Sequence, residues 1–174
     1  MSVRLAYVGV GSNCSSSNRI ELGLNALKVE FGPLALSRVY RSLPKEGCGP
    51  KYINLVVGFR TDYCWSLVRR ALKAIEKKAG RFHERKTVAL DLDLLVVINQ
   101  EQNVEKVGIS LDDLKGEPYV LFPLSELLPD CRHPESNETF KELWGSVKNP
   151  LPRLEIAADV RDSLDQLISK KKRS

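Results

Sequence analysis

The spacing of hydrophobic and polar residues predicts an ordered series of strands and helices in the first hundred residues. Short apolar runs and period-two alternation predict four strands, at Leu5–Val10, Leu34–Ser42, Tyr52–Arg60 and Leu90–Val97. Apolar positions three and four residues apart predict two helices, one with Ile20, Gly23, Leu24, Leu27 and Phe31 inward, the other with Val68, Leu72, Ile75 and Ala79 inward. The order strand, helix, strand, strand, helix, strand is that of an α+β, ferredoxin-like βαββαβ core, with an antiparallel-rich sheet and both helices on one face.

Local signals predict where the two helices begin and end. The dipeptide Gly32-Pro33 ends the first helix, and Gly80 ends the second as its C′ residue. Either Thr61 or Asp62 is expected to cap the start of the second helix, because their side-chain oxygens can accept a backbone N–H.

The chain after residue 98 is expected to add peripheral elements to this core. Its pattern predicts short elements: a helical turn at Ser110–Lys115, a strand at Tyr119–Phe122, a turn at Pro123–Leu128, and helices near Thr139–Trp144 and Asp159–Ile168. We expect residues 1–174 to form a single domain, with a disordered basic tail at 169–174.

Composition and charge narrow the classes of protein. A hydrophobic content of 43% suffices for a core without disulfide or metal support. Of the net charge of +5, four charges come from Lys170–Arg173, so the remaining body is near +1, which argues against nucleic-acid binding. No apolar run approaches the roughly 20 residues of a membrane helix, and the N-terminus lacks a signal-peptide pattern. The sequence therefore predicts a cytoplasmic monomer.

The cysteines and histidines of the chain argue against disulfide bonds and against metal sites built from these residues. The four cysteines are widely spaced and form no Cys-x-x-Cys pair, which favours free thiols: Cys14, Cys48, Cys64 and Cys131. With only His83 and His133 in the chain, a histidine-rich metal site is excluded.

Two aspartates interrupt the apolar run at 90–97. Because side chains alternate along a strand, Asp91 and Asp93 are expected to share one face with Leu95 and Val97, opposite Leu92, Leu94 and Val96. Two carboxylates that converge repel each other and lose hydration unless a cation neutralises them, and hard oxygen ligands suit Mg²⁺. The alternative is that both simply mark an exposed strand start.

Basic residues lie just before these aspartates. Arg81, His83, Arg85 and Lys86 could meet a polyanionic phosphate beside a metal site. Gly9-x-Gly11 lacks the rest of a dinucleotide-binding motif and reads as a tight turn, and no Walker lysine motif is present. A bound nucleotide would therefore be held by metal, basic side chains and backbone.

Taken in order, the motifs resemble those of the 6-hydroxymethyl-7,8-dihydropterin pyrophosphokinase family. The matching segments run through the chain from Tyr7 to Pro129: Tyr7–Asn13, Ser37–Ser42, Tyr52–Asn54, Ile75-Glu76, Gly80-Arg81, Leu90–Asp93 and Tyr119–Leu124. The resemblance implies transfer of a pyrophosphoryl group from ATP to the hydroxymethyl group of a reduced pterin, with release of AMP. It also implies two Mg²⁺ ions on Asp91 and Asp93.

The resemblance implies roles for further residues. The pterin would be bound by the amide of Asn54, by stacking on Tyr119, and by neighbouring groups at Ser42, Leu43, Pro44, Lys45 and Tyr52. ATP would be bound by Lys73, Glu76, Arg81, Arg85, Lys86, Leu94 and Lys106, and the catalytic set would be Asp91, Asp93, Arg81, Arg85 and Lys86. On the residues alone, Tyr119 reads equally well as core, Pro44 as a turn and Asn54 as a satisfied strand asparagine. Helix-end solvation would explain Lys73, Glu76 and Arg81.

Several positions depart from the family pattern on the phosphate side. The segment Phe82–Leu90 is short and lacks a tryptophan, Val88 replaces an arginine, Ser110-Leu111 replaces a Pro-His pair, and Glu117 replaces a second arginine. Arg85 or Lys86 could take over the lost contacts. The alternatives are an enzyme of this fold with an altered substrate and a non-catalytic paralogue that binds pterin or nucleotide.

Overall fold

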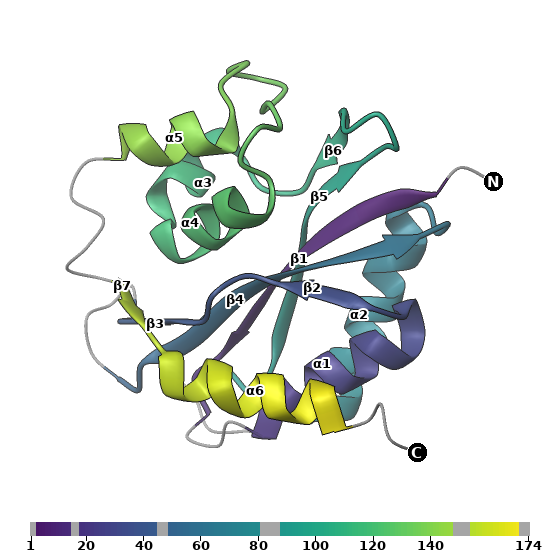
Figure 1. Ribbon diagram of the computed structural model, residues 1–174, viewed down its shortest axis with the longest axis vertical. Coiled ribbons are helices and arrows are strands. Elements are labelled where there is room, and N and C mark those ends of the chain that lie inside the picture. The colour runs from purple at the N-terminus through teal and green to yellow at the C-terminus, as the bar shows by residue number, and fades with distance from the viewer. Residues whose placement is uncertain (1–2, 15–17, 45–48, 81–87, 148–153, 171–174) are drawn as a thin grey trace.

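The strands form one antiparallel sheet that separates two groups of helices (Figure 1). The computed structural model describes residues 3–14, 18–44, 49–80, 88–147 and 154–170. The strands are β1 (Arg4–Ser12), β2 (Leu34–Leu36), β3 (Tyr40–Ser42), β4 (Tyr52–Thr61), β5 (Asp91–Ile98), β6 (Val104–Val107) and β7 (Leu154–Ile156). The helices are α1 (Asn18–Phe31), α2 (Trp65–Ala79), α3 (Leu111–Gly116), α4 (Pro118–Leu127), α5 (Phe140–Ser146) and α6 (Ala158–Lys170).

The sheet order is β6-β5-β1-β4-β3-β7, with β2 also paired to β4. All the pairings are antiparallel, and the order β1, α1, β2/β3, β4, α2, β5 confirms the predicted α+β, ferredoxin-like core. β6 and β7, which the sequence did not predict, extend the sheet at its two edges. β6 has four residues and β7 has three, so each is too short for a period-two alternation to be detected.

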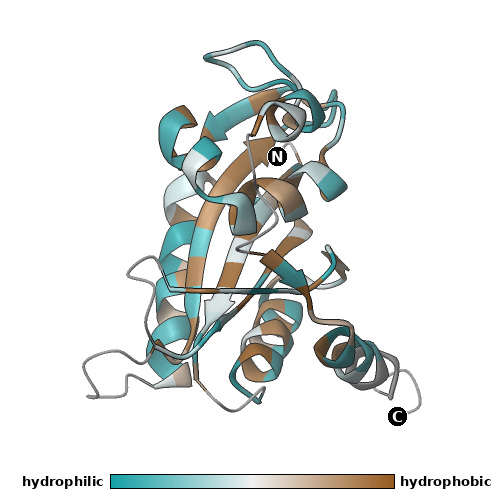
Figure 2. Ribbon diagram, turned by 90° about the vertical axis from the view of Figure 1, so that its left-hand side faces the viewer, coloured by the Kyte–Doolittle hydropathy of each residue, from teal (hydrophilic) through white to brown (hydrophobic). Residues whose placement is uncertain are grey.

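Each face of the sheet carries its own hydrophobic core. On one face, α1 and α2 pack as predicted, and α6 joins them through Val160 and Leu164. On the other face, α3, α4 and α5 close over Tyr7, Val56 and Val96. Figure 2 shows the apolar colour along much of the central strands, as expected for a sheet covered on both sides.

A bulge in β5 changes which side chains accompany the aspartates. Tyr7 pairs with Val96 and Val8 pairs with Leu94, so Leu95 is an extra residue between them. Leu95 and Val96 therefore both face the α4 side, while Val97 packs in the core of α1 and α2. The prediction that Val97 shares a face with Asp91 and Asp93 is wrong, because the bulge reverses the alternation after Leu95.

The predicted strand at Leu34–Ser42 is two strands, because the chain breaks at Ser37. The Ser37 hydroxyl accepts the N–H of Val56 at 2.9 Å, and the Ser37 N–H donates to the Val56 carbonyl at 3.0 Å. A side chain thus replaces one ladder bond, which a period-two pattern does not reveal. The predicted cap of α2 is also misplaced: β4 continues to Thr61, and Cys64 is the N-cap residue.

The segment at 119–128 is helical, which corrects the predicted strand Tyr119–Phe122 and turn Pro123–Leu128. Pro118 occupies the first turn of α4, where its missing N–H costs nothing. Leu121 and Leu124 then lie on one helical face in the second core. A short apolar run does not distinguish strand from helix, so the tertiary environment decides here.

Other sequence predictions concern helix ends, cysteines and the tail, and the structure bears on them in the part of the chain that it describes. The helical turn predicted at Ser110–Lys115 is α3, whose N-cap residue Ser110 accepts the N–H of Asp113 at 3.1 Å, and Gly80 ends α2 as its C-cap residue with a φ of 89°. The described cysteines are free, and no described helix is long and apolar enough to span a membrane. α6 includes Ser169 and Lys170, and the rest of the predicted tail lies outside the described residues. Single-domain organisation, monomeric state and cytoplasmic location stay predictions.

Candidate functional site

A cavity of about 860 Å³ lies on the sheet face that α3 and α4 cover. Its floor consists of β1, β4 and β5, and its walls are the end of β3, α2, β6 and the helices α3 and α4. The cavity is open to solvent along one side and combines polar and apolar lining residues. This is the kind of concave surface in which proteins bind small molecules.

The strand register places the predicted site residues in two adjacent rows across the floor. Asn54 pairs with Gly11, and Gly11 pairs with Asp91; two residues along, Gly9 pairs with Asp93. A Cβ on Gly11 would lie 3.4 Å from the Asn54 Oδ1 and 4.0 Å from the Asp91 Cβ. Because both central positions are glycine, no side chain stands between the amide and the carboxylates.

The carboxylates of Asp91 and Asp93 face the cavity from the open end of β5. Both reach the solvent in the cavity, yet the surrounding walls remove much of their hydration. This desolvation, followed by the charges of Asp93 and Glu76, raises the pKa of Asp91 to about 6. Desolvation likewise raises the pKa of Asp93, with the charges of Glu76 and Glu117 acting in the same direction. A bound cation would relieve this penalty, so the pair fits Mg²⁺.

Glu76 fixes the strand between the two aspartates. Its Oε1 accepts the backbone N–H of Leu92 at 2.8 Å and the ammonium of Lys73 at 2.8 Å. Glu76 is 16% exposed, whereas Lys73 is 57% exposed. Helix-end solvation therefore does not explain Glu76, which ties the last turn of α2 to the backbone of β5 between the two aspartates.

One half of the cavity carries the residues predicted to bind the pterin. The Asn54 side-chain N–H donates to the Ser42 hydroxyl at 2.9 Å, and both residues are buried. Leu43, Pro44 and Tyr52 line the cavity beside them, and Tyr119 lines it from the start of α4. The structure thus brings these residues together, although Tyr119 comes from a helix rather than from the predicted strand.

The other half carries cationic and aromatic residues. Trp65, Arg69 and Lys73 lie at four-residue intervals on α2 and all line the cavity. The ammonium of Lys106, on β6, lies 5.0 Å from the centre of the Trp65 ring. Leu94 lines the cavity although its side chain packs in the core of α1 and α2, and its contact with ATP stays a prediction.

The family described as 7,8-dihydro-6-hydroxymethylpterin-pyrophosphokinase (HPPK) matches residues 7–129, well over half of the chain. This chain belongs to the HPPK family. The match includes the floor strands and both halves of the cavity, and ends before α5, β7 and α6.

Individual relatives agree with this assignment. A Synechocystis protein named 2-amino-4-hydroxy-6-hydroxymethyldihydropteridine pyrophosphokinase is 33% identical over 153 residues, covering 82% of this chain and 75% of its own length. A Pseudomonas aeruginosa protein of the same name is 29% identical over 139 residues, covering 76% and 86%. The Schizosaccharomyces pombe folic acid synthesis protein fol1 is 29% identical over 150 residues, and the match covers 20% of its length.

Several predicted HPPK residues lie outside the described part of the chain. Arg81, Arg85, Lys86 and Lys45 belong to this group, so their roles stay predictions. Glu117 is described and lines the cavity, and its charge contributes to the raised pKa of Asp93. A carboxylate therefore adds negative charge to the site at the position where the family resemblance implies an arginine.

The lining residues of this HPPK cavity that the sequence did not point to include Trp65 and Arg69. A usable signal was present, because Trp65, Arg69 and Lys73 follow one helical stripe beside the apolar stripe of Val68 and Leu72. From the sequence, that stripe is indistinguishable from a solvated helix face. Only the tertiary structure shows that it lies beside β6 and the two aspartates.

Gly108 is required where β6 approaches β5. A Cβ at Gly108 would lie 2.1 Å from the Leu94 carbonyl oxygen and 2.9 Å from the Trp65 ring. We expect Gly108→Ala to destabilise the fold by about 1–3 kcal/mol, as overpacking does, in a chemical denaturation experiment. Gly145→Ala is the control, because no described atom outside its own helix backbone and chain neighbours lies within 4 Å of its added Cβ, and alanine favours helix α5. Equal stabilities of the two variants would contradict this close approach.

Proposed function

We propose that this chain catalyses Mg²⁺-dependent transfer of a pyrophosphoryl group from ATP to the hydroxymethyl group of 6-hydroxymethyl-7,8-dihydropterin. The products would be AMP and the pterin diphosphate, an intermediate of folate biosynthesis. One observation carries the proposal: Asp91 and Asp93 lie between a half-cavity of amide and aromatic groups and a half-cavity of cations. That order matches a pterin on one side, a triphosphate on the other and a cation between them.

The carboxylates of Asp91 and Asp93 would hold the Mg²⁺ ions, because both supply hard oxygen ligands from a partly desolvated site. Bound Mg²⁺ supplies neutralisation of the negative charge that otherwise repels an attacking alcohol from the triphosphate. Glu76 supports the pair by accepting the N–H of Leu92, which fixes the backbone between the two aspartates.

The remaining residues bind and orient the two substrates. Asn54 donates one side-chain N–H to the Ser42 hydroxyl, and its Oδ1 and second N–H would then bind the amide edge of the pterin. Tyr119 offers its ring to the pterin face. Gly9 and Gly11 leave the floor open, so the hydroxymethyl oxygen can approach the β-phosphorus next to the aspartates. A bond forms between that oxygen and the β-phosphorus, the bond from the β-phosphorus to the AMP oxygen breaks, and the alcohol proton passes to solvent.

Glu117 favours a second candidate, a binding protein of the same fold without catalysis. Its carboxylate raises the local negative charge beside Asp93 and thereby disfavours a triphosphate. The two functions differ in product: only the first releases AMP.

Incubation of the purified protein with Mg²⁺, ATP and 6-hydroxymethyl-7,8-dihydropterin tests the proposal. We expect AMP and the pterin diphosphate in equal amounts, and neither product when a chelator replaces free Mg²⁺. Absence of AMP together with tight pterin binding would support the binding protein instead. Absence of both AMP and pterin binding would overturn the proposal.

Arg69 is expected to contribute to ATP binding. Lys73 is paired with Glu76 and Lys106 lies over Trp65, whereas Arg69 makes no ion pair with a described residue. Because the site is open to water, we expect Arg69→Ala to weaken Mg-ATP binding by about 1 kcal/mol, or roughly fivefold, in calorimetry. Arg70→Ala removes the same charge from the next residue, which does not line the cavity, and should change the affinity less than twofold. Similar losses in both variants would indicate only long-range attraction.

A further inference from the structure

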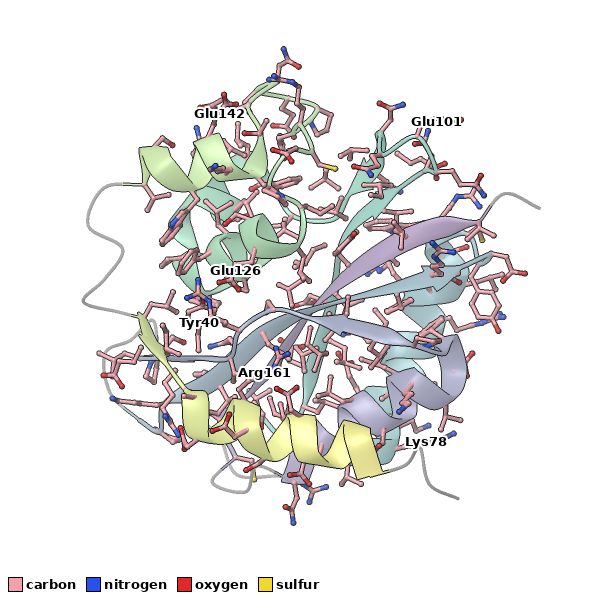
Figure 3. The ribbon with its side chains drawn as sticks, viewed as in Figure 1. Tyr40, Lys78, Glu101, Glu126, Glu142 and Arg161 are labelled. Atoms are coloured by element: carbon pink, nitrogen blue, oxygen red, sulfur yellow. The ribbon has the colours of Figure 1, made fainter. Side chains whose placement is uncertain are left out.

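Glu126, near the end of α4, collects hydrogen bonds from β3 and the residues just before it. Figure 3 shows the side chains of Glu126 and Tyr40 next to each other between α4 and β3. The Tyr40 hydroxyl donates to Oε1 at 2.7 Å, the Arg38 backbone N–H donates to Oε2 at 3.0 Å, and the Arg38 guanidinium also donates to Oε1. Tyr40 is 1% exposed and the Glu126 side chain is 17% exposed, so this carboxylate lies largely out of water.

These contacts join two walls of the same half-cavity. α4 contributes Tyr119 to the lining, and β3 contributes Ser42. Tyr40 is the register partner of Asn54, whose amide bonds to Ser42. The Glu126 carboxylate therefore links the helix that carries Tyr119 to the strand that supports Asn54.

α4 depends on tertiary contacts for its position. It has ten residues and contains Pro123, which removes a hydrogen bond from within the helix. Isolated helices of this length are marginal even without proline. Leu121 and Leu124 hold α4 against the core, but apolar packing tolerates small shifts, whereas charge-assisted hydrogen bonds fix direction and distance.

The aromatic rings around Glu126 strengthen this link. The Phe122 ring centre lies 5.3 Å from that of Tyr40 and 4.3 Å from that of Trp144, on which it stacks. The Arg38 guanidinium carbon lies 5.4 Å from the Phe122 ring centre. One turn of α4 thus contacts β3 and α5 together.

We propose that Glu126 is a positioning residue that fixes the separation between α4 and β3, and through it the width of the half-cavity for the pterin. Its consequence for the pterin rests on the function proposed above. Neither Glu126 nor Tyr40 is among the described residues that line the cavity, so Glu126 acts only through the elements that it joins.

Glu126→Gln tests this role, because glutamine keeps the size and loses the charge that binds Arg38. Without ligands, we expect faster backbone hydrogen exchange in α4 and β3. In steady-state kinetics we expect the KM for the pterin to rise about tenfold, while kcat and the KM for ATP stay within about twofold. Tyr40→Phe, which removes one of the donors, should raise the pterin KM less.

Glu30→Gln is the matched control, because Glu30 accepts a hydrogen bond from the Tyr63 hydroxyl at 3.3 Å and lies away from the cavity. It should leave both the pterin KM and the exchange of α4 unchanged. An equal rise in KM for both substrates, or an unchanged pterin KM with only a lower Tm, would overturn the positioning role. If the parent protein makes no AMP, the proposed function fails, and unchanged exchange in α4 and β3 of Glu126→Gln would separately overturn the link.

Discussion

Replacing Asp91 or Asp93 with asparagine is expected to abolish Mg²⁺-dependent ATP binding and AMP formation while the fold remains intact. Asparagine keeps the size of the side chain but removes the negative charge that attracts Mg²⁺. Desolvation already disfavours the ionised carboxylates, so the loss of one charge should leave the Tm unchanged or slightly raised in the absence of metal. Calorimetric titration with Mg²⁺ and ATP, together with thermal unfolding, measures both effects.

Asp62→Asn is the control for these substitutions. Asp62 is exposed, precedes α2 and does not line the cavity, so the same chemical change should leave Mg-ATP binding unaltered. Parent-like binding of Mg-ATP by either cavity variant would show that the metal assignment is wrong. A large fall in Tm would instead identify the aspartates as structural residues.

The arrangement of the core strands and helices follows from the hydrophobic periods, because each amphipathic element has one face to bury. Predictions from the hydrophobic period were wrong where a local feature shifted the alternation of side chains or interrupted the strand. The bulge at Leu95 reverses the faces of β5, and the Ser37 hydroxyl interrupts the strand that was expected to be continuous. In α4, a short apolar run around Pro123 folded as a helix because the second core accommodates its Leu121 and Leu124 face. None of these outcomes is encoded in the period alone.

The candidate site divides in a similar way. Asp91 and Asp93 could be proposed from the sequence because two carboxylates in an otherwise apolar strand need a cation, whereas Asn54 was proposed only through the family resemblance. Arg69 is an ordinary exposed cation until the fold places it beside the cavity. The hydrogen bond between Tyr40 and Glu126 joins residues 86 positions apart, so only the tertiary structure reveals it.

The amide of Asn54 is the group on which pterin recognition should depend most. Its Oδ1 lies above Gly11, and one side-chain N–H is held by Ser42, so the amide is fixed in direction before a ligand arrives. Asn54→Ala would leave the amide edge of a bound pterin without its partner. We expect the pterin to bind about 1–3 kcal/mol more weakly, or roughly five- to 150-fold, with little change in ATP affinity. Fluorescence titration with the reduced pterin and calorimetry with ATP measure the two affinities.

Ser42→Ala separates recognition by the amide from its orientation. This variant keeps the Asn54 amide and removes only the hydroxyl that holds it, at 2.9 Å, so the expected loss of pterin affinity is smaller, about 0.5–1.5 kcal/mol. Asn54→Asp keeps an acceptor and loses both N–H donors, which shows whether the pterin needs a donor at this position. Equal loss of pterin and ATP binding in Asn54→Ala, or a collapse of its Tm, would mean that the amide supports the sheet between β3 and β4 rather than the substrate. A loss confined to the pterin, and larger for Asn54 than for Ser42, is the result that direct recognition by this amide requires.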